Sequence, residues 1–146
     1  MTALSQVLKP RKSVFDKSQR ETVLDLTDLA EDKLDAKAFF AENFITQGMR
    51  QLYEAVFRRL DGLEDDGVFK LTEAMGGGKT HNMIAVGLLA KHPEMRKEME
   101  AIYKPKLKGA ARVISFSGRD QPEYGIWGAL AEQLGKEEVF KNFYSP

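Results

Sequence analysis

Three consecutive glycines followed by a lysine and a threonine constrain this chain more than any other feature. The segment reads Gly76, Gly77, Gly78, Lys79, Thr80. Glycine has no Cβ, so this backbone can turn several amide groups toward one point and form an anion-binding nest. A helix that begins at Lys79 would direct the positive end of its dipole to the same place. The segment therefore predicts a phosphate-binding loop.

The loop matches most of the P-loop pattern G-x-x-x-x-G-K-[ST]. Gly78, Lys79 and Thr80 fit its end, but Glu73 stands where the first glycine is expected. In a true P-loop the lysine reaches the terminal phosphates and the threonine hydroxyl binds Mg²⁺. We therefore expect ATP and Mg²⁺ as ligands, with Thr80 on the metal. The competing interpretation is a glycine-rich turn in which Lys79 is a solvated surface charge.

The segments around the loop predict an α/β fold. The expected order is strand, loop, helix, helix, strand, helix, at residues 68–72, 73–78, 79–91, 94–103, 111–116 and 124–134. The helix 79–91 is apolar almost all round, which is typical of burial against a sheet. This order predicts part of a P-loop NTPase-type parallel sheet, preceded by a small helical N-terminal region.

The N-terminal half of the chain predicts helices rather than strands. Asp35 is a candidate N-cap for a helix to about residue 43, and Thr46 for a clearly periodic helix that stops near Asp61. Residues 23–29 are expected to be extended or a short strand. The predicted division is an extended lead-in (1–22), a mostly helical region (23–66) and an incomplete nucleotide-binding domain (67–146).

Composition restricts the class of protein further. Lys and Arg number 22, as do Asp and Glu, so the formal net charge is zero, and there is no cysteine. A neutral chain gives no support to bulk coating of nucleic acid, and a cysteine-free chain has no disulfide and no thiolate site. The longest apolar run, residues 83–90, is too short to span a bilayer. With no signal peptide recognised, we expect a cytoplasmic protein without a membrane partner.

Residues 71–81, which end in Gly-Gly-Gly-Lys-Thr-His, resemble the signature of a family of large AAA-like ATPases, the domain of unknown function four-nine-nine (DUF499) family. The stretches 39–50 and 58–62 are similar to the lead-in of that family. The resemblance implies phosphate binding by residues 76–79 and Mg²⁺ coordination by Thr80. It also implies the N-terminal part of a longer prokaryotic ATPase encoded near DNA methyltransferases, helicases and nucleases, in anti-phage defence. DNA or DNA-modifying proteins are the partners expected from it. Apart from the resemblance, other copies of the chain are also candidate partners.

Hydrolysis needs an acidic residue at the tip of a second strand, and the chain offers a poor candidate. Asp120 follows the apolar stretch 113–116 only after Ser117, Gly118 and Arg119. We therefore expect this chain alone not to hydrolyse ATP. A non-hydrolysing regulatory or scaffold module is the first alternative function, and a small phosphotransferase is the second.

The remaining candidate residues have ordinary structural interpretations. His81 either contacts nucleotide or packs beside the loop, and His92 is expected at a helix end. Two separated histidines do not make a metal site. Arg58 and Arg59 are expected on a charged helix face rather than as a pair acting on a second copy. The bases between residues 91 and 108 predict a solvated face more strongly than a DNA contact, and Trp127 is expected in the core.

Overall fold

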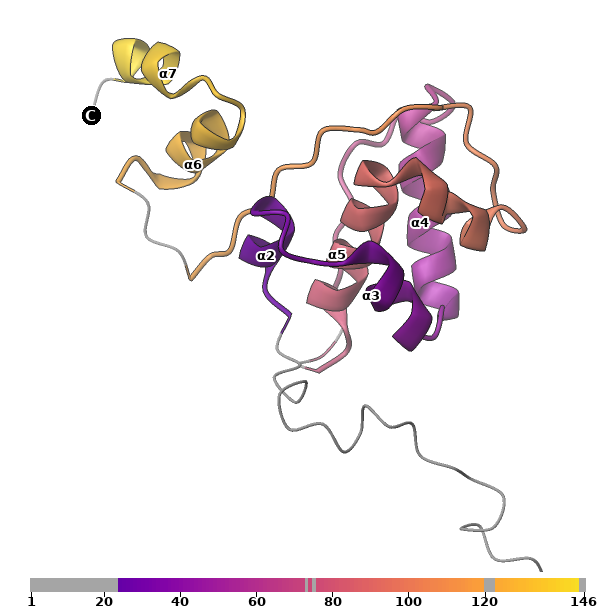
Figure 1. The fold of residues 1–146 in the computed structure, drawn as a ribbon. Coiled ribbons are helices and arrows are strands. Elements are labelled where there is room, and N and C mark those ends of the chain that lie inside the picture. Colours follow the sequence, from indigo (N-terminus) through magenta and orange to yellow (C-terminus); the bar gives the residue numbers. More distant parts are fainter. Residues whose placement is uncertain (1–23, 73, 75, 120–122, 145–146) are drawn as a thin grey trace, which may run out of the picture.

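The computed structural model describes residues 24–72, 74, 76–119 and 123–144 (Figure 1). The predicted lead-in 1–22, Glu73 and Asp120 lie outside the described residues. The described chain is helical, with elements α2 (Leu26–Ala30), α3 (Ala36–Glu42), α4 (Gln47–Leu60), α5 (Lys79–Lys91), the 3₁₀-helix η3 (Pro93–Met99), α6 (Gly125–Gln133) and α7 (Glu137–Phe143).

The hydrophobic core is built around α5, which contacts α2, α3, α4 and η3. Its apolar side chains Ile84 and Leu89 are fully buried, and so are Tyr53 and Phe57 on the facing side of α4. Each such side chain stabilises the fold by about 1.5–3 kcal/mol relative to exposure. Burial of α5 was predicted correctly, but the elements that bury it are helices and not a sheet.

Side-chain N-caps begin α2, α3 and α4. The Asp35 carboxylate accepts the amide of Ala38 at 3.0 Å, and the Thr46 hydroxyl accepts the amide of Met49 at 3.2 Å, so both predicted N-caps are confirmed. A third cap was not predicted. Asp25 accepts the amide of Thr27 at 3.0 Å and starts α2, where an extended segment or a short strand was expected.

The predicted parallel sheet is wrong for the described residues, none of which belongs to a β-strand. Residues 68–72 and 111–116 lack regular secondary structure and form no ladder with each other. They instead line a shared apolar groove of about 530 Å³, to which Phe69 and Leu71 contribute from the first segment and Val113 and Ile114 from the second. An apolar run is a strand only when a neighbouring strand pairs with its backbone, and the sequence pattern cannot supply that neighbour.

The segment after α5 is tighter than the predicted helix 94–103 and holds one buried cation. It forms the 3₁₀-helix Pro93–Met99, and Arg96 within it is only 4% exposed. Its guanidinium donates to the carbonyls of Leu89 (2.8 Å), Ala90 (2.9 Å), Leu107 (2.7 Å) and Gly109 (2.9 Å). The solvated basic face expected here is therefore wrong for Arg96, which ties the last turn of α5 to the following loop.

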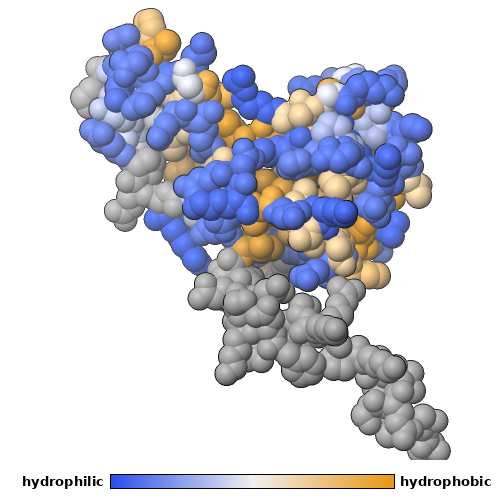
Figure 2. All heavy atoms as spheres, viewed as in Figure 1, coloured by the Kyte–Doolittle hydropathy of each residue, from blue (hydrophilic) through white to orange (hydrophobic). Residues whose placement is uncertain are grey.

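Helices α6 and α7 pack on each other and lie apart from the α2–α5 cluster (Figure 1). Tyr124 meets Phe140 and Tyr144 edge-on, with ring centroids 6.1 and 5.2 Å apart. Trp127 is 70% exposed, so its predicted place in the core is wrong. Apolar side chains are visible on the surface where the two parts meet (Figure 2). None of the described helices has the length and apolar character needed to cross a membrane.

Candidate functional site

The glycine-rich loop turns directly into α5. Gly76 and Gly78 have φ values of +82° and +75°, in the left-handed region that favours glycine. Between them, the amide of Gly77 donates to the carbonyl of Ala74 at 3.0 Å and closes a turn. A Cβ built on Gly76 or Gly78 would meet no atom within 4 Å. Both glycines are therefore required by backbone conformation, and the space beside them is open to a ligand.

Gly78 is the N-cap of α5, and it offers no side chain to bind the first amides of the helix. The early N–H groups of a helix have no partner within the helix, and no acidic residue lies in this first turn. The N-terminus of α5 therefore keeps its partial positive charge, which suits an anion.

Lys79 and Thr80 occupy the first turn of α5 beside the loop. The Lys79 ammonium group donates to the carbonyl of Ala74 at 2.9 Å, so this side chain folds back across the loop. It has at least one further interaction. Thr80 is exposed and lines both the apolar groove and a smaller polar pocket. The structure thus places both predicted binding side chains at the loop.

His81 turns away from the loop and packs into the helical cluster. Its ring stacks on Phe39 of α3 with centroids 4.8 Å apart and ring planes 27° apart. Burial lowers the pKa of His81 below its usual value, which favours the neutral ring. This geometry fits the packing interpretation of His81 rather than a nucleotide contact.

The polar pocket beside Thr80 brings together residues far apart in the sequence. It has a volume of about 190 Å³ and is lined by Leu24, Asp25, Leu26, Thr80, Ser117 and Arg119. Sequence reasoning did not group these residues. No spacing rule links Asp25 to Thr80, and only the path of the folded chain places them together. Chemically, the pocket offers a carboxylate, two hydroxyls and a guanidinium beside the loop.

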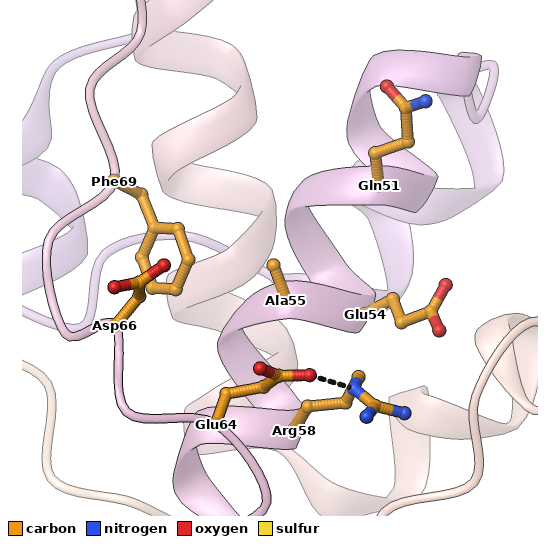
Figure 3. A pocket seen from close by; sticks show the side chains of 7 residues that line it. All are labelled: Gln51, Glu54, Ala55, Arg58, Glu64, Asp66 and Phe69. Atoms are coloured by element: carbon orange, nitrogen blue, oxygen red, sulfur yellow. Dashed lines mark hydrogen bonds and ion pairs between the residues drawn. The ribbon is translucent and has the colours of Figure 1, made fainter.

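A second pocket lies between α4 and the loop that follows it (Figure 3). It holds about 240 Å³, and its charged lining comprises three carboxylates and one guanidinium, from Glu54, Glu64, Asp66 and Arg58. The Arg58 guanidinium pairs with Glu64 at 2.7 Å (Figure 3). A surplus of carboxylates repels phosphate, so this pocket is a poor nucleotide site. Among the described residues, no group of three or more His, Asp and Glu side chains is arranged to hold a metal ion.

Arg59 donates to the carbonyl of Glu64 at 3.0 Å. Both arginines of the predicted charged face therefore fix the turn after α4.

His92 ends α5, as expected, with its amide on the carbonyl of Leu88 at 2.8 Å and its Nδ1 3.4 Å from Glu94.

Comparison with known proteins identifies the family. The family model of the DUF499 N-terminal domain matches residues 4–116, which is most of the chain. The chain belongs to the DUF499 family. No curated protein and no solved structure matches it. The DUF499 match includes α2 to α5, the glycine-rich loop and Ser115, and it ends before α6.

Proposed function

We propose that this chain binds ATP·Mg²⁺ through residues 76–80. The observation that carries the proposal is the loop geometry, in which Gly76 and Gly78 take left-handed conformations immediately before the N-terminus of α5. Backbone amides in such a turn suit the oxygens of a phosphate group, and the helix dipole adds to the attraction.

Two side chains give the loop its nucleotide character. Lys79 lies at the loop, where its ammonium group donates to the carbonyl of Ala74. From this position it could contact a phosphate bound by the loop amides. Thr80 presents a hydroxyl, a hard oxygen ligand of the kind that Mg²⁺ prefers. Nucleotide binding would shift the Lys79 contact from the neutral carbonyl to charged phosphate oxygens, which form stronger hydrogen bonds.

The experiment is a calorimetric titration of the chain with ATP in the presence of Mg²⁺, repeated with Lys79→Ala and with Lys97→Ala. Lys97 is an exposed lysine on η3, so it controls for the loss of one positive charge. Loss of Lys79 should weaken ATP binding at least ten-fold, since a charge-assisted contact is worth about 1.5–3 kcal/mol. Equal affinities for the two variants would overturn the proposal.

Hydrolysis, and the process it would serve, rest on resemblance to large AAA-like ATPases. We propose that a longer DUF499 protein uses ATP turnover in a DNA-directed, anti-phage assembly. A non-hydrolysing regulatory module is the alternative for the same loop. Measuring ATP turnover and DNA binding by the chain and by a longer DUF499 protein distinguishes them, because a regulatory module would bind ATP without releasing phosphate.

A further inference from the structure

The polar pocket beside Thr80 extends the proposed nucleotide site in one direction. It adjoins the first turn of α5, and its other walls come from the start of α2 and from the segment that ends at Arg119. Three chain segments therefore converge on the side of the loop where Thr80 presents its hydroxyl. A ligand that occupied the loop and extended past Thr80 would enter this pocket.

Hydrogen bonds hold the walls of the pocket in place. The hydroxyl of Ser115 donates to the carbonyl of Leu26 at 2.7 Å and joins the start of α2 to the segment that carries Ser117 and Arg119. The Gln133 side chain on α6 accepts from the amide of Ser115 at 3.0 Å and donates to its carbonyl at 2.8 Å. Ser117 accepts from the amide of Arg119 at 3.3 Å, which shapes the turn that carries the guanidinium. The pocket is thus built by specific contacts between distant segments.

The chemical groups in the pocket match a metal-bound phosphate. Asp25 lines the pocket and accepts both the amide and the hydroxyl of Thr27 on one oxygen, Oδ1. The Arg119 guanidinium lines the same pocket and interacts electrostatically with this carboxylate. Mg²⁺ sites in nucleotide-binding proteins use one or two carboxylates together with substrate phosphates.

We propose that this pocket is the compartment for Mg²⁺ and the terminal phosphate of the nucleotide, with Asp25 toward the metal and Arg119 toward the phosphate. This inference rests on the proposed function of the loop. It assigns to Asp25 the role of the metal-binding acid, for which the sequence pattern offered only Asp120. Arg119, which has no predicted role in the sequence pattern, becomes the second cation of the site after Lys79.

The guanidinium fits this role better than a purely structural one. Arg119 is exposed and has an electrostatic interaction with Asp25. A planar guanidinium binds phosphate with two parallel hydrogen bonds, which a lysine cannot reproduce. Arg119 lines the pocket together with Asp25, and a bound phosphate would compete with that carboxylate for the guanidinium.

The test compares four variants in titrations with ATP and with AMP, each with and without Mg²⁺. The variants are Arg119→Ala, Arg119→Lys, Asp25→Asn and the control Arg112→Ala, an exposed arginine that does not line the pocket. Arg119→Ala should weaken ATP·Mg²⁺ binding about ten-fold and AMP binding less than two-fold. Arg119→Lys should lie between Arg119→Ala and the unmodified chain. Asparagine caps a helix as well as aspartate does, so Asp25→Asn should spare α2 and reduce only the gain in affinity from Mg²⁺.

The outcomes separate this inference from the proposed function. If Lys79→Ala weakens ATP binding while Arg119→Ala and Asp25→Asn behave like Arg112→Ala, the pocket inference is wrong and the loop proposal stands. Equal weakening of ATP and AMP by Arg119→Ala would also contradict a contact with the terminal phosphate. If Lys79→Ala has no effect, both proposals fail together. Circular dichroism of each variant confirms that the helices are retained.

Discussion

Replacing Arg96 with methionine should destabilise the fold more than replacing any exposed arginine. Methionine keeps an apolar stem that can pack near Phe57, whose ring centroid lies 5.1 Å from the guanidinium carbon of Arg96. It removes the four hydrogen bonds to main-chain carbonyls, two of which belong to the last turn of α5. The carbonyls of Leu89 and Ala90, in this last turn, have no partner within the helix.

The expected size of the loss follows from these contacts. Each hydrogen bond contributes about 1 kcal/mol net, and the cation–π contact adds about 0.5–1 kcal/mol. The bonds to Leu89 and Ala90 are buried, while those to Leu107 and Gly109 are partly buried, so water can replace part of the second pair. We therefore expect a loss of about 3–5 kcal/mol in the free energy of unfolding.

Urea denaturation followed by circular dichroism at pH 7 measures this loss, with Arg112→Met as the matched control. Arg112 is exposed, so its replacement should change the free energy of unfolding by no more than about 0.5 kcal/mol. If Arg96→Met costs less than about 1 kcal/mol at an unchanged slope, Arg96 does not tie α5 to the loop at 107–109, and the reasoning is refuted.

Three further predictions concern packing, pH and the loop. A Cβ at Gly87 would lie 2.5 Å from Cδ2 of Leu29, so Gly87→Ala should cost about 1–3 kcal/mol in thermal or urea denaturation, and Leu29→Ala in the same chain should recover part of it; simple additivity would contradict this contact. Burial raises the pKa of Asp61, but hydrogen bonds from Tyr103 and from the amides of Lys106 and Leu107 outweigh it and hold that pKa below its usual value. This stabilisation is present above the unfolded pKa of about 3.9 and is lost as pH falls through the lower folded value, so Asp61→Asn should flatten the fall in stability below about pH 4; an unchanged pH profile would count against it. Gly78→Ala forces a Cβ into a left-handed conformation and should cost about 1–2 kcal/mol in stability while weakening ATP binding; a variant as stable as the unmodified chain would contradict the loop geometry.

Sequence patterns predicted those local features that depend only on residues close in the chain. Asp35 and Thr46 start α3 and α4 through side-chain contacts with amides only three residues ahead, and such contacts follow from spacing alone. The glycine-rich turn was likewise predictable, because the left-handed conformations of Gly76 and Gly78 need no distant partner. The cap at Asp25 shows the limit, since the segment that follows it mixes apolar and acidic residues and has no clear period.

Long-range arrangement was not predictable in the same way. Residues 68–72 and 111–116 have the composition of strands, yet strand formation depends on a neighbouring strand. In the described chain both segments line one apolar groove and neither is a strand. In the sequence, Arg96 is indistinguishable from the other basic residues between 91 and 108. Its burial is explained only by its hydrogen bonds to carbonyls of α5 and of residues 107–109. The pocket that joins Asp25, Thr80 and Arg119 depends on the contact of Ser115 with Leu26, which no motif encodes.

The most direct test of the central claim is a nuclear magnetic resonance titration of the isotopically labelled chain with ATP·Mg²⁺. Amide resonances report each residue separately, so the spectrum locates the ligand as well as detecting it. We predict that the amides of Gly76, Gly77, Gly78, Lys79 and Thr80 shift most, and that adenosine without phosphates shifts them far less. Unchanged loop amides at saturating ATP, or shifts confined to the acidic pocket beside α4, would contradict the account.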